Sequence, residues 1–119
     1  CGIIFGSLST CLLCVNNIRD VENDANSNKK TLAVRFSINF VRTIFVFLLI
    51  IVNSSVYYIY IGLDSSYYFI SLILFILIFS FKLSLECLYN QGEMLNDTLQ
   101  HVSMFIISVT IVLLLLILI

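Results

Sequence analysis

The longest polar stretch of the chain contains three oxygen-bearing side chains that recur every fourth residue, Asn16, Asp20 and Asp24. On a helix this spacing places the three along one face, with a rise of about 6 Å per step. Such a stripe is costly unless a positive charge lies beside it. Mg²⁺ suits carboxylate oxygens, and proteins typically hold it with one or two carboxylates together with substrate phosphates. The stripe therefore indicates a magnesium site.

Basic residues follow the acidic stripe within the same stretch, namely Lys29, Lys30 and Arg35. Their charges can meet the phosphate oxygens that a metal leaves free, and an arginine can do so with two parallel hydrogen bonds. The stripe and its basic tail together indicate a cradle for a magnesium-bound diphosphate. The same charges are also typical of a solvated loop that does no chemistry, and the spacing alone favours neither interpretation.

The elements that position these residues follow from the composition of the chain. Hydrophobic residues make up 61% of its 119 residues and charged residues 11%, whereas soluble domains have about 45–50% apolar and about 25% charged residues. Lipid suits such a chain, and only helices or closed barrels span it. Because strand-like alternation is lacking, we expect an all-α, multi-pass transmembrane helical bundle. The charge-free stretches, each near the ~20 residues that cross a bilayer, are 1–18, 43–63, 65–81 and 102–119.

The charge of the links between these stretches predicts their orientation. Five of the six basic residues lie in the first link, and the positive-inside rule places the first and third links in the cytoplasm. We therefore expect a multi-pass protein of the cell (inner) membrane. Nucleic-acid binding is not expected, because it needs dispersed basic patches. The predicted elements are helices at about 1–18, 38–63, 65–88 and 97–119 and a cytoplasmic motif loop at about 16–37.

The amino-acid sequence of the loop resembles a motif of a known family. The loop is similar to the second aspartate-rich motif of UbiA-type membrane prenyltransferases. The similarity lies in residues 16–20 (NNIRD), in Asp24 and in residues 29–35 (KKTLAVR). Within that superfamily the loop is most similar to the branch that prenylates 1,4-dihydroxy-2-naphthoate on the way to menaquinone. That branch typically reads NNxRDxxxD, then Gly-Lys, then TLAVR and Leu-Gly.

The loop departs from this pattern at two places. Asn28 stands where the family has a Gly before the Lys, and Asn is the non-glycine residue that best tolerates a left-handed backbone, so a tight turn can survive. Phe36 and Ser37 stand where the family has Leu-Gly, at the start of the next helix. Neither change removes an expected ligand.

The resemblance implies a fold and a reaction. It implies a bundle of nine transmembrane helices, of which residues 1–119 would supply the last four as part of one domain. The family's first aspartate motif would precede them, so we expect this part alone to be inactive. Mg²⁺ acts on the leaving diphosphate of a polyprenyl diphosphate as a Lewis acid, and the aromatic acceptor attacks the allylic cation. In the naphthoate branch the product is demethylmenaquinone, formed with loss of diphosphate and CO₂.

The resemblance also assigns roles to positions in the loop. By matching positions, the expected roles are metal ligands and catalytic residues at Asp20 and Asp24, an auxiliary metal ligand at Asn16, diphosphate contacts at Lys29 and Arg35, and an orienting role for Arg19 toward the stripe or the acceptor carboxylate. Two alternatives stay open. One is a UbiA-type prenyltransferase for another aromatic acceptor, and the other is a non-catalytic membrane carrier or subunit with a charged cytoplasmic loop.

Polar residues outside the loop predict structural roles. Lys82 and Glu86 are four residues apart and suit an ion pair on one helix. Asn96 or Asp97 is expected to cap the last helix, whose N-terminus favours a side-chain acceptor and negative charge. His101 has no Cys, Asp or Ser constellation near it in the sequence, and we assign it no catalytic role.

Overall fold

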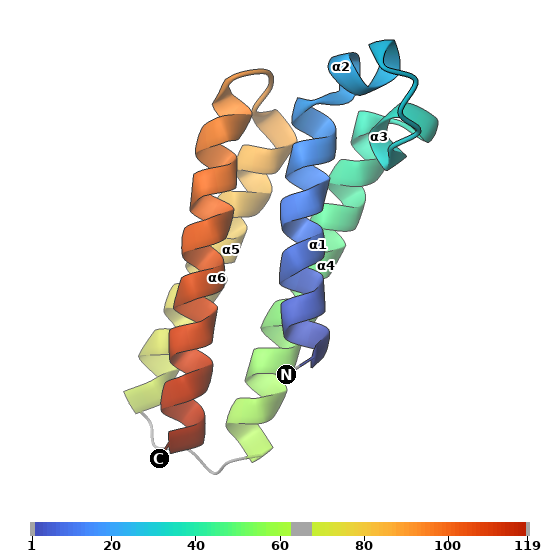
Figure 1. Ribbon diagram of the computed structural model, residues 1–119. Coiled ribbons are helices and arrows are strands. Elements are labelled where there is room, and N and C mark those ends of the chain that lie inside the picture. Colours follow the sequence, from blue (N-terminus) through green and yellow to red (C-terminus); the bar gives the residue numbers. More distant parts are fainter. Residues whose placement is uncertain (1, 63–67, 119) are drawn as a thin grey trace.

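Helices account for the secondary structure in the part of the chain that the computed structural model describes, residues 2–62 and 68–118 (Figure 1). The all-α prediction is confirmed for these ranges, which contain no strand. Four helices are long and two are short. In chain order they are α1 (Gly2–Arg19), α2 (Val21–Asn26), α3 (Leu32–Arg35), α4 (Ile38–Gly62), α5 (Tyr68–Tyr89) and α6 (Met94–Leu118).

The four long helices have the length and composition of membrane spans. They contain 18 to 25 residues each, and a helix crosses the hydrocarbon core with ~17–25 residues. All four are apolar enough to do so. The chain is therefore a multi-pass helical membrane protein, as its composition predicts.

Buried residues recur along these helices at spacings of three and four residues. This spacing places one seam of each helix against its neighbours, as in coiled coils and most four-helix bundles. α1 packs mainly against α4 and α6, and α5 packs against the same two helices. Phe79 of α5 meets Phe105 of α6 edge to face, with ring centroids 5.4 Å apart. The seam of α6 is formed by Leu95, Thr98, Val102, Phe105, Val109, Val112 and Leu116.

Polar side chains reinforce the apolar seams at a few points. Asn53 of α4 donates a hydrogen bond from Nδ2 to Oγ of Ser80 in α5, over 2.8 Å. Asn90, just after α5, donates from Nδ2 to Oγ1 of the buried Thr98 in α6, over 3.0 Å. Such bonds between helices are a common means of fixing their association in lipid.

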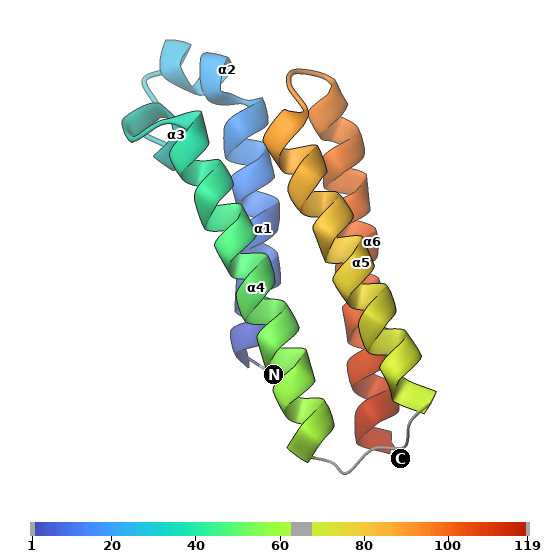
Figure 2. The same ribbon diagram turned by 180° about the vertical axis from the view of Figure 1, so that it is seen from behind.

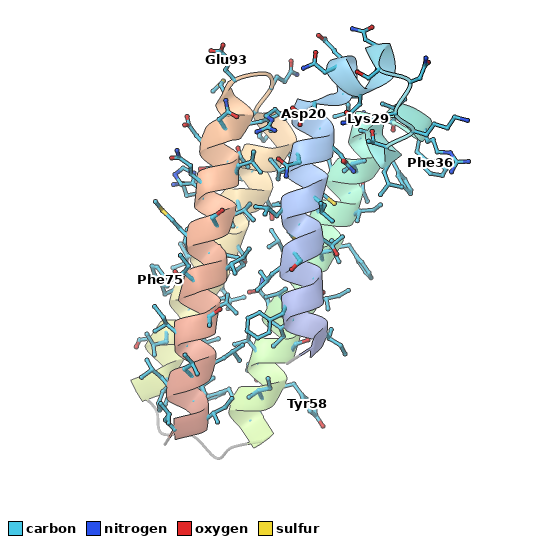
Figure 3. All side chains as sticks on the ribbon, in the orientation of Figure 1. Asp20, Lys29, Phe36, Tyr58, Phe75 and Glu93 are labelled. Atoms are coloured by element: carbon cyan, nitrogen blue, oxygen red, sulfur yellow. The ribbon has the colours of Figure 1, made fainter. Side chains whose placement is uncertain are left out.

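The short helices and the link between α5 and α6 lie together at one end of the bundle, as Figures 1 and 2 both show. The start of α1 and the end of α6 lie toward the opposite end of the bundle. Side chains follow the same division, since Asp20, Lys29 and Glu93 lie at the first end and Tyr58 at the other (Figure 3). The predicted first and third links therefore share one end of the bundle.

The last helix begins earlier than expected. α6 starts at Met94 rather than at residue 97, so Asn96 and Asp97 lie in its first turn and the capping prediction is wrong. The reason is the tight turn before it, where Gly92 adopts a φ of 57° and its carbonyl accepts a hydrogen bond from Leu95 N over 3.1 Å. The expected helix boundaries at 1, 63, 65 and 119 lie outside the described residues.

Candidate functional site

The acidic stripe crosses the joint between α1 and α2. Asp20 separates the two helices with φ −94° and ψ 8°, a conformation sparsely used by non-turn residues. The backbone nevertheless keeps its four-residue steps, because Asp20 N bonds to Asn16 O over 2.9 Å and Asp24 N bonds to Asp20 O over 2.8 Å. The stripe predicted from spacing thus retains helical hydrogen bonding from one member to the next.

Arg19 ties this stripe to the last helix. Its Nε and Nη2 donate to the two carboxylate oxygens of Asp20 over 2.8 and 2.9 Å, and its Nη1 donates to Oδ1 of Asn96 over 3.2 Å. The hydrogen bonds from Arg19 hold the pKa of the Asp20 carboxyl below its usual value. Asp20 is therefore a carboxylate at neutral pH, and Arg19 is paired with it rather than standing free.

The turn after α2 returns Lys29 to the acidic stripe. Asn28 adopts a φ of 56°, and Lys29 N bonds to Asp24 O over 2.9 Å while Asn28 N bonds to Ala25 O over 3.2 Å. These two bonds form a Schellman motif, in which a left-handed residue closes the helix end. The expectation that Asn28 preserves a tight turn is confirmed.

Asp24 is enclosed by this turn. The residue is 7% exposed, and its Oδ1 lies 3.4 Å from Nζ of Lys29. Within residues 2–62 and 68–118 this is the one ion pair that Asp24 makes. A buried carboxylate needs close compensation of its charge, and a single long pair with an exposed lysine leaves coordination capacity unused.

The remaining predicted contacts lie farther along the loop. Arg35 ends α3 and is exposed, and in the described part of the chain it makes no ion pair with Asp20 or Asp24. Ser37 then caps α4, because its Oγ accepts a hydrogen bond from Phe40 N over 3.1 Å. A serine at this position satisfies an otherwise free helix donor, so the departure from Leu-Gly leaves the next helix well started.

The donor set of the stripe fits magnesium in chemistry. Two carboxylates and an amide oxygen are hard ligands of the kind that Mg²⁺ accepts, with substrate phosphates completing its coordination. In the described ranges no three His, Cys, Asp or Glu side chains are grouped to hold a metal. Asp20 and Asp24, with Asn16, are the residues that would hold magnesium, and substrate phosphates would complete its coordination.

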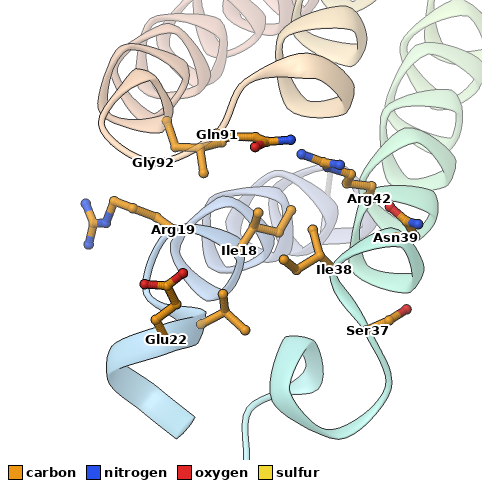
Figure 4. Close-up of a pocket in the computed structure, with 11 residues that line it drawn as sticks. Ile18, Arg19, Glu22, Ser37, Ile38, Asn39, Arg42, Gln91 and Gly92 are labelled. Atoms are coloured by element: carbon orange, nitrogen blue, oxygen red, sulfur yellow. The ribbon is translucent and has the colours of Figure 1, made fainter. Parts of the chain in front are cut away.

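A cavity of about 520 Å³ lies beside the stripe, between the end of α1, the start of α4 and the link from α5 to α6 (Figure 4). Of the predicted site residues that the structure describes, only Arg19 is among the residues that line the cavity. Arg42 of α4, for which the sequence analysis predicted no role, also lines it. The full lining is Ile18, Arg19, Val21, Glu22, Ser37, Ile38, Asn39, Arg42, Gln91, Gly92 and Leu95.

A second polar cluster joins α5 and α6. Nδ1 of His101 lies 2.8 Å from Oε2 of Glu86, and Oε1 of Glu86 lies 3.4 Å from Nζ of Lys82. The predicted pair between Lys82 and Glu86 is confirmed. The contact of His101 was missed because its partner is fifteen residues away on another helix, and only the packing of the helices brings the two together.

These features define a class of protein: a multi-pass helical membrane protein with an acidic stripe and basic residues at one end. Residues 1–107 match the UbiA prenyltransferase family. The chain belongs to that family. Comparisons with curated proteins and with solved structures gave no match.

Proposed function

We propose that this chain is part of an enzyme that transfers a polyprenyl group from polyprenyl diphosphate to 1,4-dihydroxy-2-naphthoate, giving demethylmenaquinone with loss of diphosphate and CO₂. Family membership supports prenyl transfer as the class of reaction. The observation that supports the site is the return of Lys29 to Asp24 beside Asp20, at one end of four membrane spans. We place the loop at the cytoplasmic face of the cell (inner) membrane.

Each loop residue has a defined task in this proposal. Asp20 and Asp24, aided by Asn16, would hold Mg²⁺ together with the diphosphate, and the metal would supply a Lewis acid for the leaving group. Lys29, whose side chain is 69% exposed, turns from the Asp24 carboxylate to a phosphate oxygen. Arg35, exposed at the end of α3, would contact the same diphosphate.

Two alternatives to this proposal are a non-catalytic carrier or subunit and a prenyltransferase for another aromatic acceptor. Family membership favours an enzyme over a non-catalytic carrier or subunit. The identity of the acceptor rests on the resemblance of residues 29–35 to the naphthoate branch. Assaying 1,4-dihydroxy-2-naphthoate against 4-hydroxybenzoate decides between acceptors, and preference for the second would overturn the naphthoate assignment while leaving prenyl transfer intact.

The test of the proposed site is prenyl transfer by the full-length enzyme in lipid nanodiscs. We expect Asp20→Asn and Asp24→Asn each to lower the rate by about 100-fold or more, a typical loss when one electrostatic stabiliser of a transition state is removed. Asp97→Asn is the matched control, because Asp97 is an exposed acid at the same end of the bundle. A normal rate for Asp20→Asn would show that the assigned role is wrong.

A further inference from the structure

Large apolar side chains are exposed around the short helix α3, which lies outside the four membrane spans. Leu32 and Val34 of α3 are 40% and 36% exposed, and Phe36, the residue after the helix, is 60% exposed. Ala33 is buried, so one side of α3 packs against the protein and the other side is open. Phe36 points away from the long helices (Figure 3). Exposed apolar clusters of this kind mark surfaces that contact a partner or a membrane.

The exposed side chains of α3 continue onto the first turn of α4. The rings of Phe36 and Phe40 lie 5.0 Å apart between their centroids, and Phe40 is 45% exposed. Phe47, about two helical turns further along the same face of α4, is 62% exposed. Because α4 is apolar enough to span a membrane, this exposed face suits lipid. The cluster at α3 therefore extends the apolar exterior of a membrane span, and we call it the α3 patch: Leu32, Val34, Phe36 and Phe40.

Lys30 adds a positive charge beside the α3 patch. It precedes α3 by two residues and is exposed, and none of the ion pairs within residues 2–62 and 68–118 includes it. Lys29, in contrast, is paired with Asp24. Apolar side chains flanked by a free basic residue are typical of segments that lie in the membrane interface, because acyl chains cover the apolar side and anionic headgroups attract the base. The patch and Lys30 together fit an anionic lipid surface.

We propose that the α3 patch binds the surface of an anionic phospholipid bilayer. Leu32 and Phe36 enter the boundary between headgroups and acyl chains, and Lys30 contacts a lipid phosphate. The motif loop is then fastened at both of its ends, by the turn from Asn28 to Asp24 on one side and by lipid on the other. This inference is independent of the reaction, because it needs only the open side of α3, the free charge and the neighbouring span.

The test is the depth of a nitroxide spin label on the full-length protein in lipid nanodiscs. The label is attached at Val34→Cys, with Cys1 and other accessible cysteines replaced by Ser, and its collisions with oxygen and with a water-soluble nickel chelate are compared. We expect the label to lie ~5–10 Å inside the layer of lipid phosphates. A label at Asn23→Cys, an exposed position of α2 outside the patch, is the reference and should meet the nickel chelate more than oxygen.

Two further variants separate the apolar and charged contributions. Adding Phe36→Ser should shift the label at position 34 toward water, whereas Phe36→Leu, which keeps an apolar side chain, should leave its depth unchanged. Replacing half of the phosphatidylcholine by phosphatidylglycerol should move the label deeper, and Lys30→Gln should abolish that shift. Lys82→Gln is the matched control, because Lys82 is a basic residue of another helix that is paired with Glu86, and it should keep the shift.

Three outcomes would overturn the inference. A label at position 34 that meets the nickel chelate more than oxygen would place α3 in water. A label shielded from both reagents would show that another segment of the full-length protein or a second copy covers the patch. Equal depth in the two lipid mixtures for the protein with native Lys30 would exclude the anionic lipid. Circular dichroism of each variant checks that the helices are retained, and the Phe36→Leu arm repeats the substitution with an apolar residue.

Discussion

Asn28 shows how a single residue positions the predicted ligands. Its left-handed backbone closes α2 and turns the chain so that Lys29 meets Asp24 through both its backbone and its side chain. Glycine adopts this conformation without steric cost, and asparagine is among the few other residues that adopt it readily. The replacement of the family's glycine therefore preserves the geometry of the turn.

The turn predicts a graded response to substitution at this residue. Asn28→Gly should be nearly neutral, whereas Asn28→Val should destabilise the protein by about 1–2 kcal/mol, because a β-branched residue is strained in the left-handed region. Unfolding in mixed detergent micelles measures the difference. Asn23→Val, an exposed position within α2, is the control and should cost clearly less. Equal losses at the two positions would contradict the role given to the turn.

At the scale of elements, the helices were predictable but their buried faces were not. Hydropathy identifies the four spans because each is long and nearly free of charge. It does not separate Phe45, which is fully buried, from Phe47, which is 62% exposed. The reason is that residues facing lipid are as apolar as residues facing other helices, so the seam is defined only by packing.

The local roles of polar residues could be predicted from the sequence only in part. The pair between Lys82 and Glu86 follows from one helical turn, and the tolerance of Asn28 follows from its backbone preference. The start of α6 was misplaced because Asn96 and Asp97 suit a cap in sequence, while Gly92 begins the turn earlier in the structure.

The contact between His101 and Glu86 predicts a measurable contribution to the pairing of α5 and α6. Glu86→Gln should destabilise the protein by about 0.6–2 kcal/mol, the range found for hydrogen bonds between membrane helices. Ser108→Ala is the control, since the Ser108 hydroxyl bonds only within its own helix, to Met104 O, among the contacts described. Detergent-titrated unfolding measures both, and a larger loss for Ser108→Ala would argue against the contact.

At the scale of the whole molecule, the distribution of charge predicts the orientation in the membrane. The first link, which contains α2 and α3, lies at the same end of the bundle as the link between α5 and α6 (Figures 1 and 2). The sequence predicts this arrangement from the positive-inside rule. It does not reveal that Arg19 bonds to Asn96, because the two are 77 residues apart and only the fold brings them together. The cavity at Arg42 is hidden from the sequence for the same reason.

The orientation predicts which positions are reached from each side of the membrane. Single cysteines placed at Asn23 and Glu93 should both react with an impermeant maleimide in inverted vesicles, because the positive-inside rule predicts that their end of the bundle faces the cytoplasm. A cysteine at Tyr58, near the opposite end (Figure 3), should react in right-side-out vesicles. Of the four native cysteines, Cys11, Cys14 and Cys87 are buried and should give little background, and Cys1 is replaced by Ser in every variant. Labelling of positions 23 and 93 from opposite sides would contradict the topology.

The central claim is that Asp20 and Asp24 hold a metal together with a diphosphate, and the most direct measurement is coupled binding. We would titrate the full-length protein in nanodiscs with Mg²⁺ and with a non-hydrolysable prenyl thiodiphosphate, each with and without the other. Each ligand should raise the affinity of the other by the same factor, roughly tenfold or more, and this coupling should vanish in Asp20→Asn and Asp24→Asn. Independent binding of the two ligands to the unchanged protein would contradict the claim.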